Sequence, residues 1–193
     1  MSSILNELAR QDYWRCIMYA SLQEQLEHER WIGTGVEFGG SNKVIQNYFP
    51  RISWEIRKYP KYDITKEGSF EKKWDVIVAD QILEHVTEPW TAMRLIGEST
   101  KIMAVITVPF MIRIHRSPED YWRMTPKAIK MLAEPYFKNI DIRSWGTTNA
   151  TLWHSLYDNT PNLLANVAEE ELATELNSND GQRPFVIWAV LRK

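Results

Sequence analysis

The sequence predicts an α/β fold built on a mostly parallel β-sheet. Short apolar segments rich in β-branched residues alternate with amphipathic segments along most of the chain, which is typical of repeated strand–helix–strand units. Polar residues or glycines follow the predicted strands, as they do where the strands of such a sheet end at a ligand site. The 193 residues, 44% of them hydrophobic and 25% charged, suffice for one domain with a substantial core.

The first 30 residues or so are predicted to be helical. Apolar residues recur there at intervals of three and four: Trp14, Ile17, Met18, Leu22 and Leu26. We expect residues 1–32 to form an N-terminal helical cap and residues 33–193 to form a single α/β domain. The cap could be a lid over the site or a dimer surface, and the sequence leaves both open.

The predicted strands and helices then alternate. Strands are expected over residues 34–38, 52–59, 74–81, 101–108, 139–145 and 184–193. Helices are expected over residues 43–49, 87–100, 151–159 and 161–176, with another beginning at residue 126. The polar stretch 60–70 predicts a strand that is brief or absent.

Capping residues mark two of the helix starts. Thr87 is a candidate N-cap, with Pro89 in the first turn of the helix. Thr125 followed by Pro126 predicts a second start, a cap and then a proline at the first helical position.

Composition excludes several classes of protein. The net charge is −2 and no basic block occurs, so we expect no nucleic-acid partner. The single cysteine, Cys16, rules out an internal disulfide and the paired-cysteine zinc motifs, and its apolar neighbours place it in the core. The longest apolar run, residues 102–112, is shorter than the roughly 20 residues that span a bilayer, and no signal peptide is visible. We expect a cytoplasmic protein with no membrane partner.

Reactive residues gather where the strands end. Glu37, Gly39 and Gly40 end the first strand, Glu55 lies in the second, residues 81–85 follow the third, and residues 115–123 follow the fourth. Since parallel strands end at the same edge of a sheet, these segments are expected to meet there. Gly39 would let the backbone approach a ligand closely, but the spacing fits neither the dinucleotide fingerprint nor a P-loop.

Four segments carry a resemblance to a known family: GVEFGGSN, FEKKWDVIVADQILEHVTEPWTAMRLI, VITVPFMIRIHRSPEDYWRMTPKAIKML and YFKNIDI, in that order. Together they resemble the class I S-adenosylmethionine-dependent methyltransferases, in particular the small methyltransferase-domain group, over roughly residues 34–145. LEHV and HxxPxDYWRxT are the more specific parts. The resemblance implies a Rossmann-like seven-stranded, mostly parallel sheet with helices on both faces and an antiparallel last strand.

The resemblance also implies a cofactor, S-adenosyl-L-methionine, and residues that bind it. Glu37 and the turn at Gly39 and Gly40 would frame its methionine part. An acid at the end of the second strand would bind the ribose hydroxyls. Glu55, 18 residues after Glu37, is the better match, and Asp63 is the alternative.

The segment after the third strand would lie along the same cofactor. The resemblance implies that Gln81, Ile82 and Leu83 lie beside the cofactor and His85 near its methyl end. Ser41 and Lys43 stand where the family carries further glycines, and residues 99–104 replace its usual Pro-Gly-Gly.

The loop HRSPEDYWR is predicted to form the acceptor side of the site. Methyl transfer from a sulfonium needs no metal, so no metal ligands are assigned, but a hydroxyl acceptor must lose its proton. His115 is a candidate general base because its unperturbed pKa lies near neutrality, and His85 is its competitor. Asp120 could orient a histidine or hydrogen-bond the substrate.

The remaining loop residues are candidates for binding the acceptor. Tyr121 and Trp122 could form one wall of its pocket, and Arg123 could hold an anionic group. A structural interpretation stands beside this one, in which Asp120 and Arg123 form a local ion pair and Trp122 is core.

The leading hypothesis is therefore an S-adenosylmethionine-dependent O-methyltransferase. Its acceptor would be a small molecule, such as a sugar, a glycan precursor or another polar metabolite. The alternative is a catalytically inactive methyltransferase-like partner or scaffold, and a nicotinamide enzyme is a weaker third. Whether the protein is a homodimer stays open.

Overall fold

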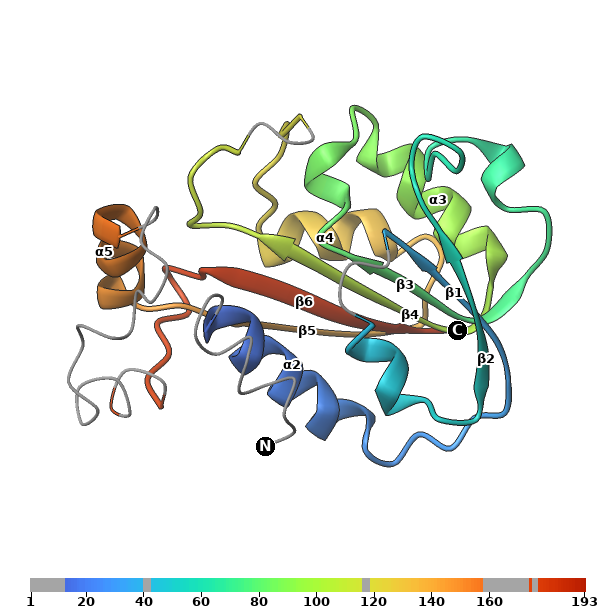
Figure 1. Ribbon diagram of the computed structural model, residues 1–193, viewed down its shortest axis with the longest axis horizontal. Helices are drawn as coiled ribbons and strands as arrows, with labels where there is room; N and C mark the ends of the chain where they lie inside the picture. Colours follow the sequence, from blue (N-terminus) through green and yellow to red (C-terminus); the bar gives the residue numbers. More distant parts are fainter. Residues whose placement is uncertain (1–12, 40–42, 116–118, 158–173, 175–176) are drawn as a thin grey trace.

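A six-stranded sheet flanked by helices forms the centre of the computed structural model (Figure 1), which describes residues 13–39, 43–115, 119–157, 174 and 177–193. The strands are β1 (Gly33–Phe38), β2 (Ile52–Arg57), β3 (Trp74–Asp80), β4 (Thr100–Pro109), β5 (Asn139–Trp145) and β6 (Val186–Arg192). Their order across the sheet is β2-β1-β3-β4-β6-β5.

The strand directions confirm the predicted architecture. Strands β2, β1, β3 and β4 are parallel to one another, whereas β6 runs antiparallel to both β4 and β5. The described residues form six strands rather than the seven that the family resemblance implies. The difference lies beyond β2, where residues 58–73 hold only the 3-10 turn η2 (Glu67–Ser69), since this polar stretch lacks an apolar run that could pair as a strand.

Helices cover both faces of the sheet. Helix α2 (Tyr13–Leu26) packs on β6 and β5 on one face, and α3 (Pro89–Ser99) and α4 (Pro126–Ala133) lie on the other, as Figure 1 shows. Each face has its own apolar cluster. The predicted face of α2 is confirmed, because Trp14, Met18, Leu22 and Leu26 are all buried.

Of the two predicted helix caps, one is confirmed and one is wrong. Thr125 caps α4 as expected, its side chain accepting a hydrogen bond from the amide of Ala128. The prediction of Thr87 as an N-cap was wrong: Pro89 is the first helical residue, so Glu88 occupies the cap position and its side chain makes no capping hydrogen bond.

Two other predicted helices differ in extent. Residues 43–49 form only the 3-10 turn η1 (Ile45–Tyr48), while α5 (Thr148–Tyr157) begins three residues earlier than predicted. The helix expected over residues 161–176 and the first part of the N-terminal one, residues 1–12, lie outside the described residues, apart from residue 174.

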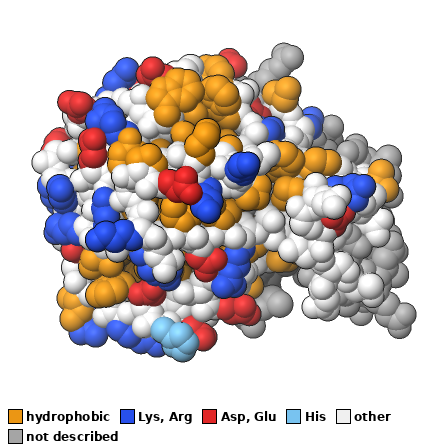
Figure 2. Space-filling view, turned by 180° about the vertical axis from the view of Figure 1, so that it is seen from behind, with side chains coloured by type: hydrophobic (Ala, Val, Ile, Leu, Met, Phe, Trp, Pro, Cys, Tyr) orange, Lys and Arg blue, Asp and Glu red, His pale blue; other side chains and the backbone are white. Residues whose placement is uncertain are grey.

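Charges of both signs are distributed over the face seen in Figure 2, where Lys and Arg side chains alternate with Asp, Glu and hydrophobic ones. Within the described residues, no helix has the length and apolarity that a bilayer crossing requires.

Candidate functional site

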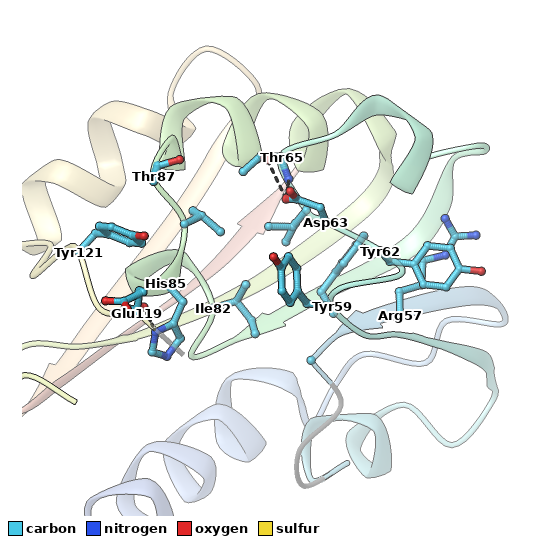
Figure 3. Close-up of a pocket in the computed structure, with 14 residues that line it drawn as sticks. Arg57, Tyr59, Tyr62, Asp63, Thr65, Ile82, His85, Thr87, Glu119 and Tyr121 are labelled. Atoms are coloured by element: carbon cyan, nitrogen blue, oxygen red, sulfur yellow. Dashed lines mark hydrogen bonds between the residues drawn. The ribbon is translucent and has the colours of Figure 1, made fainter. Parts of the chain in front are cut away.

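A cavity of about 570 Å³ opens at the carboxyl ends of β1 and β3. Its walls come from the end of β1, from Arg57 at the end of β2 and residues 59 and 62–65 after it, from residues 82 and 85–87 after β3, and from Glu119 and Tyr121 in the loop after β4 (Figure 3). Cavities of about 300–1,000 Å³ are typical of small-molecule sites, and this one lies where the sequence predicted the reactive segments to meet.

Gly39 forms the floor where β1 ends. It has a φ of +89°, a conformation that L side chains rarely adopt, and a Cβ there would lie 2.7 Å from Cδ1 of Ile82. Its amide donates to the carbonyl of Arg57 at 3.0 Å, which continues the pairing of β1 with β2 beyond Phe38. Gly40 lies outside the described residues, and Lys43, at a position where the family has glycine, takes a φ of +56°.

The two candidate acids lie in different places. Asp63 lines the cavity, where its Oδ1 accepts hydrogen bonds from the amide and hydroxyl of Thr65 at 2.9 and 2.7 Å. Its Oδ2 has no hydrogen-bond partner in the described part of the chain. Glu55 does not line the cavity, because its carboxylate binds the Nε of Arg57 at 2.7 Å and Lys72 at 3.7 Å.

Aromatic side chains stand beside Asp63. Figure 3 shows Tyr59, Tyr62 and Asp63 on one side of the cavity and Tyr121 on the other, with Ile82 between them. Tyr59 is 77% exposed, so its ring is free to contact a ligand.

A buried arginine fixes the tyrosine side of the cavity. The guanidinium of Arg57 lies 4.7 Å from the ring centres of both Tyr62 and Trp74. The carboxylate of Glu55 pairs with this guanidinium at 2.7 Å and compensates its charge. The ion pair holds Arg57 in place beside Tyr62.

A buried acidic region lies next to the cavity, at the ends of β1 and β3. Glu37 accepts a hydrogen bond from the amide of Gln46, yet burial and then the charge of Asp80 raise its pKa above the usual range. Asp80 accepts from the hydroxyl of Tyr19 at 2.6 Å and from that of Thr107 at 2.5 Å. Sequence reasoning overlooked Asp80, although an acid that ends a buried strand was the available signal.

The residues after β3 have separate roles. Gln81 has a φ of +56°, and its amide and side-chain nitrogens both donate to the hydroxyl of Thr107, at 3.0 and 2.9 Å. Ile82 lines the cavity, whereas Leu83 is wholly buried in the core. Of the three predicted cofactor contacts in this segment, only Ile82 therefore presents its side chain to the cavity.

Glu84, His85 and His115 form a cluster at the cavity edge. The Nε2 atoms of the two histidines lie 3.3 Å apart, and Oε1 of Glu84 lies 3.6 Å from Nε2 of His85. Burial and the charges of Asp80 and Asp120 raise the pKa of Glu84 to about 8. Burial lowers the pKa of His85, and the neighbouring His115 lowers it further. Glu84 was not a predicted site residue, although it directly precedes His85 in the LEHV motif.

Asp120 and Arg123 form the local ion pair of the structural interpretation. The guanidinium binds both oxygens of the carboxylate and also donates to the carbonyls of Ile112 and Arg113. Burial alone would raise the pKa of Asp120, but the hydrogen bonds from Arg123 and the amide of His115 outweigh it and lower the pKa. The pair holds the loop in place, and neither side chain lines the cavity.

The two aromatic residues of the loop also differ. Tyr121 lines the cavity and is 50% exposed, and its amide donates to the carbonyl of Glu84 at 2.8 Å. The indole of Trp122 donates to the carbonyl of Val86 at 2.8 Å and its ring packs edge-on against Trp90, away from the cavity.

Comparison with known proteins identifies the fold. No protein-family model matches this sequence, and no curated protein sequence matches it either. Among solved structures, it is similar to a methyltransferase from Archaeoglobus fulgidus described as SAM-dependent, with a TM-score of 0.58, 11% identity and all of both chains covered.

Two further solved structures are similar over most of this chain. Phosphoethanolamine N-methyltransferase 2 from Haemonchus contortus, solved with S-adenosyl-L-methionine, gives a TM-score of 0.53 at 10% identity, over 100% of this chain and 60% of that one. An O-methyltransferase family protein from Burkholderia thailandensis gives 0.52 at 8% identity, over 91% and 55%. The chain therefore has the Rossmann-like fold of the class I S-adenosylmethionine-dependent methyltransferases.

Proposed function

We propose that this protein is an S-adenosylmethionine-dependent methyltransferase that acts on a hydroxyl group of a small polar acceptor. The cavity at the carboxyl ends of β1 and β3 is the observation that carries the proposal, because it joins an open glycine turn, a carboxylate with an unpartnered oxygen and exposed tyrosines.

The tyrosine side of the cavity suits the nucleoside half of the cofactor. Asp63 offers a carboxylate oxygen that can accept from a ribose hydroxyl or an adenine amino group. Tyr59 and Tyr62 offer ring faces against which a base can pack. We assign the nucleoside acid to Asp63 rather than Glu55, because Glu55 is the counter-ion of Arg57.

The acidic side of the site suits the methionine half. Bound S-adenosylmethionine would supply an electrophilic methyl group on a positively charged sulfonium. Glu37 and Asp80 are buried carboxylates next to the cavity, the charge of Asp80 helps to raise the pKa of Glu37, and two such groups are complementary to the ammonium and sulfonium of this cofactor.

The histidine side of the cavity suits the acceptor. His85 and Tyr121 face the cavity across from Tyr59 (Figure 3). An acceptor hydroxyl held between them would lie within reach of an imidazole, the group that sequence reasoning assigned as the base. Arg123 is committed to Asp120, so the acceptor does not depend on that guanidinium for an anionic contact.

Replacing Asp63 tests the proposed orientation. Asp63→Asn should weaken binding of S-adenosylhomocysteine roughly 10- to 150-fold, since a hydrogen bond to a charged group contributes about 1.5–3 kcal/mol. Isothermal titration calorimetry measures this, with Asp141→Asn on β5 as the matched control outside the cavity. Equal affinity in the wild type and Asp63→Asn would remove Asp63 from the cofactor site.

The scaffold alternative makes a different prediction. A catalytically inactive partner protein would bind neither S-adenosylmethionine nor S-adenosylhomocysteine, or would bind them without methylating any acceptor. A nicotinamide enzyme would instead bind NAD. Titrations with all three compounds, followed by a methyl-transfer assay with S-adenosylmethionine, therefore separate the hypotheses.

A further inference from the structure

The two histidines of the cluster meet through the same ring atom. His85 belongs to the 3-10 turn η3 (Leu83–His85) that follows β3, and His115 belongs to the loop that follows β4. Their Nε2 atoms are 3.3 Å apart and their rings are nearly perpendicular, at 88°. One potential ligand atom from each of Glu84, His85 and His115 lies within 4.8 Å of the other two.

Both histidines turn their other nitrogen toward an oxygen that can only accept a hydrogen bond. Nδ1 of His85 lies 2.8 Å from the carbonyl oxygen of Glu119, so that nitrogen carries a hydrogen. Nδ1 of His115 lies 3.0 Å from Oδ2 of Asp120, at an angle outside hydrogen-bond geometry. With a hydrogen on Nδ1 of both rings, the two Nε2 lone pairs would face each other across 3.3 Å, and a cation between them would turn this contact into an attractive one.

The spacing fits a metal ion. Zn–N bonds of about 2.0–2.1 Å at a tetrahedral angle separate two ligand nitrogens by about 3.3–3.4 Å. The observed separation of the two Nε2 atoms is 3.3 Å. The oxygens beside Nδ1 of each ring supply the outer contacts that orient metal-binding histidines.

Glu84 supplies the third donor. Its side chain is buried, and Oε2 has no hydrogen-bond partner among the described residues, while Oε1 lies 3.6 Å from Nε2 of His85. A buried carboxylate oxygen without a donor is costly, and a cation at the cluster would remove that cost.

We propose that Glu84, His85 and His115 bind one divalent transition-metal ion, with Zn²⁺ the best fit, at the edge of the cavity. Two imidazoles and one carboxylate suit Zn²⁺, Fe²⁺ or Co²⁺ better than Mg²⁺ or Ca²⁺, which prefer oxygen donors. Three protein ligands leave a coordination position for an exogenous group, as in catalytic rather than structural zinc sites. No metal ligands were expected from the sequence, because methyl transfer from a sulfonium needs none. Glu84 and His85 meet His115 only through the fold.

The ion would change the role of the histidines. A bound hydroxyl oxygen would become more acidic, and its proton would pass to solvent, so neither imidazole need act as the base. The acceptor would then be a molecule whose hydroxyl can coordinate a metal. This role rests on the proposed methyl transfer, whereas the binding of the ion does not.

The test is a titration of the tag-free, EDTA-treated full chain with Zn²⁺, followed by calorimetry and by thermal unfolding. We expect one Zn²⁺ per chain, a rise in the unfolding temperature, and no comparable response to Mg²⁺. Binding of Co²⁺ with the visible spectrum of a four-coordinate nitrogen and oxygen site would identify the ligand type.

Variants assign the ion to the cluster. His115→Ala should abolish the binding, and its matched control His28→Ala, whose side chain is 91% exposed, should leave it unchanged. Glu84→Gln retains the shape of the side chain and should weaken the binding as well. Asp120→Asn, beside His115, should weaken it by about 10- to 100-fold, the usual cost of losing an outer contact. Unfolding curves in EDTA show whether each variant folds.

Metal binding and cofactor binding can be tested separately. Absence of one-to-one Zn²⁺ binding to the wild type, or equal binding by His115→Ala, overturns the metal site and leaves a proton shared by the two rings. Titration with S-adenosylhomocysteine in EDTA reports on the cofactor site alone, so either result can fail without the other.

Discussion

Asp75 shows how single residues join the strands of this sheet. Its Oδ2 accepts from the amide and hydroxyl of Thr34 on β1 at 2.8 and 3.1 Å, and its Oδ1 lies 3.4 Å from the ammonium of Lys101 on β4. Partial burial by itself would raise the pKa of Asp75, but the contacts from Thr34 and Lys101 outweigh it and lower the pKa.

This contact should make folding stability depend on acid. Because the folded pKa lies below the unfolded value of about 3.9, Asp75 stabilises the fold above that pH and loses its contribution as the pH falls through the folded pKa. Asp75→Asn should therefore lower the free energy of unfolding at pH 7 and flatten its decline below about pH 4. Urea unfolding across that range measures both effects, and parallel pH profiles for the variant and the wild type would show that Asp75 contributes nothing.

The site illustrates what a sequence conveys about individual residues. Glu55 was preferred over Asp63 from its spacing to Glu37, but only Asp63 lines the cavity, since spacing does not tell which side chain is turned toward a ligand. The meeting of His85 and His115 was equally hidden, because 30 positions separate them and only the β3–β4 pairing brings them to 3.3 Å. The turn at Gly39 could be predicted from the sequence, because a positive φ strongly favours glycine.

At the level of elements, α2 is attached to the sheet through a buried hydrogen bond. The hydroxyl of Tyr19 on α2 donates to Asp80 at the end of β3, and the hydroxyl of Tyr48 on η1 donates to the carbonyl of Tyr19 at 3.0 Å. The first bond has a charged acceptor and the second a neutral one, so the first should contribute more.

Paired tyrosine substitutions test this difference. Tyr19→Phe should lower the free energy of unfolding by about 1.5–3 kcal/mol, and Tyr48→Phe by about 0.5–1.5 kcal/mol. Urea denaturation at pH 7 measures both. An equal or larger loss in Tyr48→Phe would mean that the Asp80 contact does not anchor the helix.

The connection from β5 to β6 depends on the absence of a side chain at Gly146. A Cβ there would lie 2.1 Å from the carbonyl oxygen of Arg183 and 2.3 Å from the amide nitrogen of Phe185, both backbone atoms that cannot move aside easily. Gly68 in η2 is the matched control, since a Cβ there meets nothing within 4 Å.

Alanine at these two glycines should have opposite effects. Gly146→Ala should cost about 1–3 kcal/mol or more through overpacking. Gly68→Ala should stabilise the fold by up to about 1 kcal/mol, because it restricts the unfolded chain. Thermal unfolding of both variants gives the comparison, and a stable Gly146→Ala protein would show that the two strands can separate there without cost.

Elements were predicted well where the local pattern was strong. The strands at 74–80 and 100–109 are continuous apolar runs, and the cap at Thr125 has its own chemistry, so each was found with small errors at its ends. The short apolar segment 43–49 was ambiguous in length, and the chain makes only a 3-10 turn there. No strand forms between β2 and β3, because residues 58–73 are mostly polar, and the sheet of the described residues therefore has six strands.

At the scale of the whole molecule, the sheet order sets the site. The end of β1 carries Gly39, the segment after β3 carries Ile82 and His85, and the loop after β4 carries Tyr121, so three neighbouring strands converge on one cavity. Sequence reasoning reached the convergence because the edge rule for parallel sheets is general. The sequence could not show which of these side chains line the cavity. That depends on which of them are held in other hydrogen bonds and ion pairs of the fold.

A calorimetric titration of the wild-type chain with S-adenosylhomocysteine measures whether the cavity binds the sulfur nucleoside of a methyltransferase. We expect one site per chain and, at about 100 times the Kd, a stabilisation of the fold by roughly 2.7 kcal/mol, with no such response to NAD. No heat and no stabilisation at saturating nucleoside would contradict this expectation, and would leave a methyltransferase-like fold with another purpose.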